Sequence, residues 1–130
     1  MAHIIGIGGV FLKAKNPKLM TAWYQEHLGI AFGDQTYFLF KEGDADKPAA
    51  TGSSVFSFFK EESKYFNPSV KPYMINFRVH DLLQMLEGLK KAGVEVVGDM
   101  EDTEYGKFGW IMDPEGNKIE LWEEPVEQKH

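Results

Sequence analysis

The sequence predicts an α+β fold built from two similar halves, because the same order of elements occurs twice along the chain. Residues 4–60 read as a strand, a helix and two further strands, and residues 73–124 repeat this order with three strands after the helix. The two helices align when Asn16 is placed over Asp81. A repeat of about 60 residues that occurs only twice is too long and too rare for most solenoids. We therefore expect two halves of one domain.

We expect this single domain to span residues 1–130. The first module covers about residues 3–62, a linker covers about residues 63–72, and the second module covers about residues 73–124. A chain of this length has room for one hydrophobic core and leaves no room for a second globular domain.

Composition excludes several classes of function. The chain has 14 basic and 20 acidic residues and no cluster of Lys or Arg, so phosphate backbones and anionic lipids would repel it. It has no cysteine, which excludes disulfides, zinc thiolates, iron–sulfur clusters and thiol nucleophiles. Its first residues lack the basic segment of a signal peptide and the long apolar run of a membrane span. We expect a soluble, cytoplasmic protein that binds neither nucleic acid nor membranes.

The first helix is delimited by its capping residues. Asn16 suits the N-cap, Pro17 suits the first helical position, and Gly29 suits a left-handed position after the last turn. The apolar residues between them recur at helical spacing. They include Trp23 and Tyr24, which we expect in the core.

The second helix and the strands also have periodic apolar residues. Asp81 suits the N-cap, and apolar residues follow at positions i, i+3, i+4 and i+7 before Gly93. In the strands, apolar residues alternate with a period of two, so one face of each strand should pack on a helix. The residues assigned to that face are Val10, Leu12, Phe56, Phe58, Ile75, Phe77, Val79, Ile119 and Leu121.

The connections are marked by turn-forming residues. Residues 113–117, with the sequence DPEGN, predict the turn of a hairpin, because Pro fixes φ and Gly accepts a positive φ. Residues 42–54 predict a loop. Residues 64–72 contain Pro68 and Pro72 and predict an irregular connection between the two modules.

Three features together resemble the vicinal oxygen chelate superfamily. They are the duplicated βαβββ units, the segment WYQEHLGI at the end of the first helix, and the segment DPEGNKIELWEE at the end of the second module. The superfamily includes glyoxalase I, the extradiol dioxygenases, the fosfomycin-resistance enzymes and the bleomycin-resistance proteins. The resemblance implies two βαβββ modules whose strands form U-shaped curved sheets around a concave cleft. It also implies that two chains pair as a homodimer.

The resemblance places four metal-ligand positions in the cleft, on the first and last strands of each module. In this chain they fall on Gly9, Ser57, Met74 and Glu120. Divalent metal ions need several oxygen or imidazole donors, and only Glu120 is a usual ligand among these four. We therefore expect no metal at this site and no cofactor.

Polar residues of the second module are the first candidates for binding a ligand. Alternation along the strand places Asn76 and Arg78 on the face of Met74. If the modules pack as in the superfamily, as the resemblance implies, these two residues share one wall of the cleft with Glu120. Arg78 is the only arginine of the chain, and a guanidinium suits a carboxylate or a phosphate. Two interpretations stay open. Either Arg78 is structural, paired with Glu120 or placed in solvent at the strand end, or it holds an anion or a carbonyl while Glu120 acts as acceptor or general base.

Aromatic residues are candidates for the apolar walls of the cleft. Trp110 and Trp122 lie close to Glu120 on the two strands of the last hairpin. Residues 104–109 form either a lip over the cleft or an ordinary turn. The remaining candidates for ligand binding are Phe11, Tyr105, Phe108, Ser57 and Met74.

The residues leave two classes of function open. The favoured one is metal-free binding or sequestration of a small organic molecule in an aromatic cleft, similar to the bleomycin-resistance proteins. The alternative is a glyoxalase-like lyase or isomerase, or a dioxygenase, that uses Glu120 as base or ligand. This alternative asks more of the site, because without a metal only Arg78 and Asn76 would stabilise an enolate. The environment of Glu120 distinguishes the two functions. A Glu120 that is paired with and neutralised by Arg78 favours the binding function, and a desolvated Glu120 that faces an open cavity favours the enzyme.

Overall fold

The computed structural model describes residues 2–44 and 47–125 of the chain. Within these ranges it contains one mixed sheet of seven strands in the order β2-β3-β1-β4-β7-β6-β5, with two helices. The elements are β1 (His3–Ala14), α1 (Pro17–Leu28), β2 (Tyr37–Asp44), β3 (Lys47–Lys60), β4 (Tyr73–His80), α2 (Leu82–Lys91), β5 (Glu101–Thr103), β6 (Gly106–Met112) and β7 (Lys118–Glu123). None of the helices in this part of the chain is long and apolar enough to cross a membrane.

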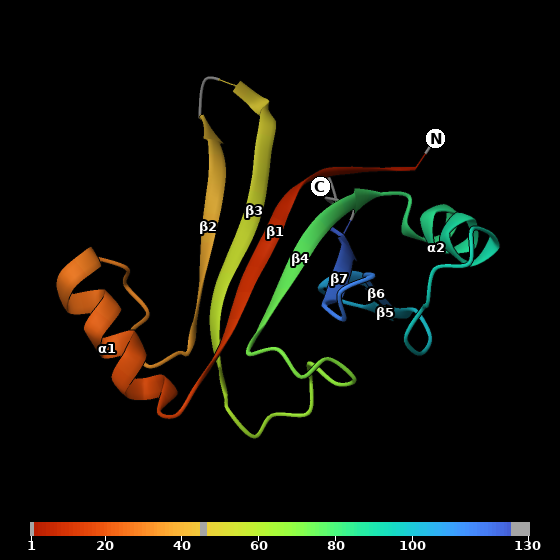
Figure 1. The fold of residues 1–130 in the computed structure, drawn as a ribbon. Helices are drawn as coiled ribbons and strands as arrows, with labels where there is room; N and C mark the ends of the chain where they lie inside the picture. The colour runs from red at the N-terminus through yellow and green to blue at the C-terminus, as the bar shows by residue number, and fades with distance from the viewer. Residues whose placement is uncertain (1, 45–46, 126–130) are drawn as a thin grey trace.

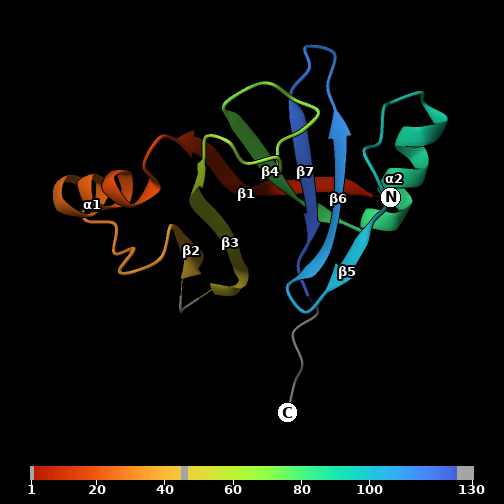
Figure 2. The same cartoon turned by 90° about the horizontal axis from the view of Figure 1, so that it is seen from below.

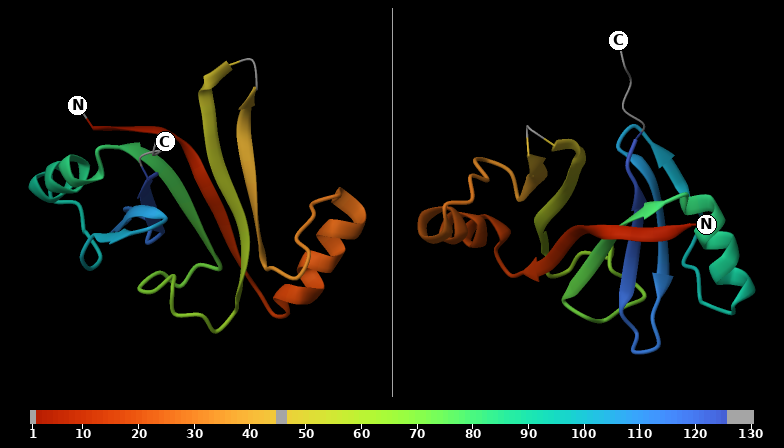
Figure 3. Two further views of the ribbon diagram at one scale, coloured as in Figure 1. Left: turned by 180° about the vertical axis from the view of Figure 1, so that it is seen from behind. Right: turned by 90° about the horizontal axis from the view of Figure 1, so that it is seen from above.

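The two modules use the same strand pairing. In the first module β1 is parallel to β3, and β3 is antiparallel to β2; in the second module β4 is parallel to β7, and β7 is antiparallel to β6. The antiparallel pair β1–β4 joins them at the centre of the sheet. Figure 1 shows the sheet curling into a U, with β2 and β3 in one arm and β5, β6 and β7 in the other. The helices α1 and α2 lie outside the two arms, as the views from behind and above in Figure 3 also show.

The predicted α+β fold with a curved sheet is confirmed, and the two modules differ in one detail. The second module has three strands after its helix, whereas the first has two strands after α1. The expected βαβββ order is therefore complete only in the second module. Only eight residues, 29–36, connect α1 to β2, and turns and bends occupy them.

Both helices begin at the predicted caps. The side chain of Asn16 accepts a hydrogen bond from the Leu19 amide at 3.1 Å, and Gly29 closes α1 with a φ of 71°. The side chain of Asp81 accepts from the Gln84 amide at 3.2 Å, although the φ of Asp81 is 58°. This left-handed conformation lets α2 begin directly after β4, and Asp tolerates it better than most residues.

The loop predicted at residues 42–54 is wrong. The β2–β3 hairpin extends through most of this segment, with Glu42 opposite Gly52 and Asp44 opposite Lys47, and residues 45–46 lie outside the described residues. Backbone pairing with the neighbouring strand forms the ladder whatever the polarity of the side chains. Pro48 is compatible with this strand because β3 pairs with β1 only from Val55 onward, so Pro48 lies where β3 has one strand partner.

The predicted turn at residues 113–117 is confirmed. Asp113 accepts hydrogen bonds from the amides of Glu115 and Asn117, both at 2.9 Å, and Gly116 has a φ of 82°. Residues 61–72 contain no helix or strand and connect the ends of β3 and β4, which is easiest to follow from below in Figure 2.

Apolar side chains gather in three clusters. One lies between α1 and the first module, and a second lies between α2 and the second module. These two contain all the residues predicted to face the helices except Val10 and Ile75. Tyr24 packs in the first cluster as expected, whereas Trp23 is 50% exposed on the outer face of α1, contrary to expectation. The third cluster lies on the concave side of the sheet around Phe11, Phe66, Met74 and Trp110.

Candidate ligand-binding cleft

A cleft of about 580 Å³ lies between the two arms of the sheet. Its polar floor is formed by Asn76 of β4 and Glu120 of β7, which are neighbours in the β4–β7 pair. The first module supplies one wall and the second module the other. The lining residues are Gly8, Phe11, Tyr37, Leu39, Lys41, Ser53, Val55, Asn76, Glu104, Tyr105, Phe108, Glu120, Trp122, Glu124 and Pro125.

Glu120 is the buried polar centre of this floor, with an exposed fraction of 2%. Its Oε1 accepts a hydrogen bond from Asn76 Nδ2 at 2.6 Å. Its Oε2 accepts from Trp110 Nε1 at 2.8 Å and from the hydroxyl of Tyr65. Three neutral donors therefore satisfy the carboxylate oxygens away from water.

Tyr65 connects the floor of the cleft to the linker between the modules. Burial, together with the negative charge of Glu120, raises the pKa of the Tyr65 hydroxyl well above its usual value near 10. Tyr65 therefore remains a neutral donor to Glu120 over the physiological pH range.

Lys118 is the nearest described cation behind this floor. It is 8% exposed, donates to the backbone oxygen of Tyr65 at 2.7 Å, and lies 5.3 Å from the Tyr65 ring centre and 5.6 Å from the Trp110 ring. Burial lowers the Lys118 pKa, and the charge of Glu120 partly opposes that shift. The two rings separate the ammonium from the cleft. Lys118 is not among the described residues that line the cleft.

Asn76 has one unsatisfied group. The residue is 2% exposed, and its Oδ1 has no hydrogen-bond partner. The oxygen lies against Gly8 of β1, where a Cβ atom would overlap it. Glycine at position 8 thus lets the two modules approach each other at the floor, and the carbonyl oxygen remains unpaired there.

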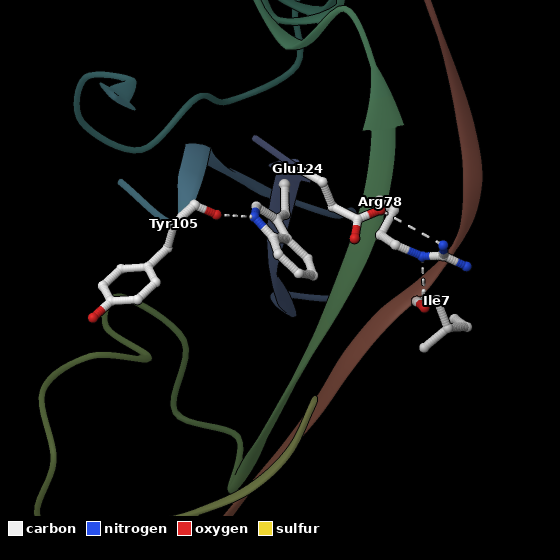
Figure 4. Close-up of polar contacts among 5 residues, drawn as sticks. Ile7, Arg78, Tyr105 and Glu124 are labelled. Atoms are coloured by element: carbon white, nitrogen blue, oxygen red, sulfur yellow. Dashed lines mark hydrogen bonds and ion pairs between the residues drawn. The ribbon is translucent and has the colours of Figure 1, made fainter. Parts of the chain in front are cut away.

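Arg78 does not pair with Glu120, and the interpretation of a structural Arg78–Glu120 ion pair is wrong. Glu120 accepts its hydrogen bonds from other residues, while Arg78 Nη1 lies 3.7 Å from Glu124 Oε1 and its Nε donates to the Ile7 carbonyl at 3.3 Å. Figure 4 shows this side chain crossing from β4 toward β1, with Ile7 and Glu124 on its two sides.

The position of Arg78 depends on glycine at two places. A Cβ atom at Gly6 or at Gly52 would overlap the guanidinium. Arg78 is 9% exposed and is not among the residues that line the cleft. It supports the wall from behind by holding Glu124.

Aromatic rings form the wall of the second module. Phe108 and Trp122 stack with ring centres 6.0 Å apart and planes 6° apart. Trp122 Nε1 donates to the backbone oxygen of Tyr105 at 2.8 Å, a bond drawn in Figure 4. This bond fixes the Trp122 indole and links the segment before β6 to the wall of the cleft.

The structure separates the predicted site residues into two groups. Phe11, Tyr105, Phe108, Trp122, Asn76 and Glu120 line the cleft. Ser57, Met74, Arg78 and Trp110 lie outside its lining, and two of these, Met74 and Trp110, belong to the apolar cluster directly beneath it. Tyr65 was missed, because no local pattern reveals a hydrogen bond between residues 55 positions apart.

The four family ligand positions do not fit a metal ion. Glu120 already accepts three hydrogen bonds, and the donors point their positive ends to where a cation would lie. Met74 is fully buried in the apolar cluster, and a Cβ at Gly9 would lie 2.9 Å from the Phe11 ring. No cluster of three or more His, Cys, Asp or Glu residues is suited to a metal in the described part of the chain.

A larger depression of about 680 Å³ lies elsewhere, beside the start of α1. Three exposed lysines, Lys15, Lys18 and Lys60, surround it. None of the described residues that line it is a buried polar group comparable to Glu120 or Asn76. The smaller cleft is therefore the better candidate site, because buried polar groups converge there within apolar walls.

Comparisons with known proteins agree with this architecture. A methylmalonyl-CoA epimerase in complex with methylmalonyl-CoA and NH4+ matches with a TM-score of 0.70 and 14% identity, over 98% of this chain and 100% of that one. The methylmalonyl-CoA epimerase of Mycobacterium tuberculosis matches with a TM-score of 0.60 and 20% identity, over 94% and 89%. A member of the glyoxalase/bleomycin resistance protein/dioxygenase superfamily from Vibrio splendidus 12B01 matches with a TM-score of 0.53 and 11% identity, over 95% and 100%.

At such identities these likenesses show the fold alone. No curated protein matches the chain in sequence. A family model matches residues 6–121, which include both modules and Glu120. The chain therefore belongs to the Glyoxalase/Bleomycin resistance protein/Dioxygenase superfamily.

Proposed function

We propose that this protein binds a small organic molecule in the cleft without a metal ion, similar to the bleomycin-resistance branch of its superfamily. One observation carries the proposal: a floor of two buried polar residues, Asn76 and Glu120, lies between apolar and aromatic walls. Aromatic walls stabilise a flat ligand by burial and stacking, and a few polar groups fix its orientation.

The hydrogen bonds of Glu120 favour binding over proton transfer. A general base needs a lone pair directed at the proton that it removes. Three acceptor positions of this carboxylate are occupied by hydrogen bonds from Asn76, Trp110 and Tyr65. The carboxylate is therefore fixed in place, and fewer of its lone pairs remain for a substrate proton. The absence of a metal-ligand set leaves no strong electrophile for a developing enolate in the described residues of the cleft.

Two tryptophan variants test whether the cleft is the binding site. Bicyclic aromatic compounds are screened by ligand-observed NMR, and the affinities of those that bind are measured by calorimetry. Trp122→Ala removes one wall and should weaken binding about tenfold or more. Trp23→Ala is the matched control on the outer face of α1 and should leave affinity unchanged. Equal affinity of Trp122→Ala and the parent protein would reject the cleft as the site.

The enzyme alternative has one observation in its favour, since Glu120 borders the cleft. The structural neighbours include methylmalonyl-CoA epimerases, so methylmalonyl-CoA is the first substrate to test. The experiment measures exchange of its C2 proton in deuterated water. Exchange that is catalytic in the parent and lost in Glu120→Gln would replace the binding proposal by an isomerase. We expect no exchange above the rate of the buffer.

The proposal includes a homodimer and a cytoplasmic location. Ile4, Ile5 and Ile7 at the start of β1 are 43%, 51% and 44% exposed, where β3 does not pair with β1 in the described residues. A second copy would bury this apolar edge. Light scattering at micromolar concentration should give twice the mass of the chain, and cell fractionation tests the location.

A further inference from the structure

We infer that the ligand is a hydrogen-bond donor: a flat neutral or cationic compound whose N–H group binds the floor of the cleft, and not a carboxylate or another anion. This inference rests on the proposed function and specifies its ligand class. It follows from which donors and acceptors of the floor are already used.

The donors at the floor are engaged within the protein. Asn76 Nδ2, Trp110 Nε1 and the Tyr65 hydroxyl all donate to Glu120. In the wall above, Trp122 Nε1 donates to the Tyr105 carbonyl. An anionic group that arrived at this floor would meet no side-chain N–H or O–H from these four residues.

The acceptors at the floor are not all engaged. Asn76 Oδ1 has no partner although it is buried, and an unsatisfied buried carbonyl costs about 1–3 kcal/mol. Glu120 Oε1 accepts one hydrogen bond and has a second lone pair. A donor on the ligand that reached Oδ1 would therefore relieve an existing cost.

The orientation of the Asn76 amide is fixed by Glu120. In the reverse orientation Oδ1 would take the place of Nδ2, which lies 2.6 Å from Glu120 Oε1, and two acceptors would face each other. Asn76 therefore presents its oxygen, and not its NH₂ group, on the side of Gly8.

The charges of the residues that line the cleft also disfavour an anionic ligand. Among the described lining residues, three are acidic, Glu104, Glu120 and Glu124, and one is basic, Lys41. Arg78 lies 3.7 Å from Glu124, and Lys118 is held behind the Tyr65 and Trp110 rings, so these two cations offset part of the negative charge from outside the cleft. The aromatic faces of the wall favour a cation over an anion. An anionic ligand would gain neither hydrogen bonds nor charge attraction at the floor.

Two isosteric pairs of compounds test the inference on the parent protein by calorimetry. Indole and benzofuran differ by one N–H that is replaced by an oxygen, so indole should bind about tenfold or more tightly. Tryptamine and indole-3-acetate differ in charge, and tryptamine should bind more tightly by a similar factor. Equal or tighter binding of benzofuran or indole-3-acetate would overturn the inference and leave the proposed function intact. If none of the four binds at millimolar concentration, the proposed function itself fails.

A variant then assigns the preference to Asn76. Asn76→Leu removes the unpaired oxygen at similar volume and should bring indole and benzofuran to within about twofold of each other. Asn117→Leu is the matched control, because Asn117 has the other buried unpaired amide oxygen found in the described residues and lies outside the cleft. It should retain the full preference for indole. A preference that survives in Asn76→Leu would overturn the assignment, and if that variant does not fold, the two ligand pairs on the parent decide.

Discussion

In the first module Phe11 of β1 lies beside Ser57 of β3, whereas at the matching place in the second module Asn76 of β4 lies beside Glu120 of β7. The strands pair in the same way, so topology alone does not explain the difference. One module presents a ring and a small hydroxyl, and the other presents a buried carboxylate with its donors. The two modules thus share the same strand pairing, and only the second contains the polar floor of the cleft.

This division shows what each module contributes to recognition. The polar cluster depends on a closely packed neighbour, because Gly8 of the first module lies against Asn76 and Phe11 lines the same cleft. The first module therefore supplies shape and the second supplies hydrogen bonds. Variants at matched positions of the two modules test this division directly.

The largest effect is expected at Glu120. Glu120→Ala leaves Asn76, Trp110 and Tyr65 without an acceptor and should lower the free energy of unfolding by about 3–5 kcal/mol. Ser57→Ala changes the matching position of the first module and should cost less than about 0.5 kcal/mol. Urea unfolding measures both. Similar losses in the two variants would contradict the division.

A smaller effect is expected where the first module meets the polar cluster. The Cβ atom in Gly8→Ala would overlap Asn76 Oδ1 and lie 3.0 Å from Arg78 Cγ and 3.1 Å from Trp122 Cε3, so the cost should be about 1–3 kcal/mol. The control is Gly88→Ala on α2, which meets no atom within 4 Å. It should stabilise the protein by about 0.5–1 kcal/mol. Thermal unfolding distinguishes the two, and a neutral Gly8→Ala would mean that the floor adapts easily.

Tyr65 should produce a loss of stability at alkaline pH. Its pKa is raised in the folded protein, so the unfolded chain loses the proton first, near pH 10. The stabilising contribution is complete below that pH and is lost as the pH rises toward the folded pKa. Tyr65→Phe should cost about 1 kcal/mol at pH 8 and should unfold with a shallower alkaline decline than the parent. Tyr105→Phe, which changes a 68% exposed side chain, should follow the parent curve.

The smallest effect is expected for the ion pair behind the wall. A double-mutant cycle with Arg78→Met and Glu124→Gln should give a coupling of about 0.5–1 kcal/mol, because the pair is partly exposed and its closest atoms are 3.7 Å apart. The cycle with Arg78→Met and Glu120→Gln should be additive within about 0.5 kcal/mol. A larger coupling energy in the second cycle would show that Arg78 and Glu120 interact after all.

The sequence was sufficient for elements with strong local signals. Asn16, Asp81 and Gly29 predicted the helix boundaries, and residues 113–117 predicted the last turn, because capping and turn chemistry act within a few residues. The offset of 65 between Asn16 and Asp81 makes Phe11 equivalent to Asn76 and Gly9 equivalent to Met74. In the β1–β4 pair Phe11 lies opposite Met74 and Gly9 lies opposite Asn76, so the two equivalent pairs are related by a local two-fold axis.

The sequence was insufficient where partners come from distant segments. Alternation and the resemblance together placed Asn76, Arg78 and Glu120 on one wall, but they do not reveal that Tyr65 of the linker donates to Glu120. They also cannot show that Arg78 lies against Gly6 and Gly52 instead of turning to Glu120. Residues 42–54 were misread because their polar composition resembles a loop, whereas the register of the β2–β3 hairpin extends into them.

The hydrogen bond from Tyr65 also limits how the two modules can be rearranged. A connection that only joins two modules tolerates insertion, cleavage or exchange between chains. Here the connection carries one of the three donors of Glu120, and Phe66 beside it is fully buried. A domain-swapped dimer that opened at this connection would have to deliver Tyr65 and Phe66 to the same places in the partner chain. Circular permutation with new ends between Tyr65 and β4 would remove the direct chain connection between the second module and this donor.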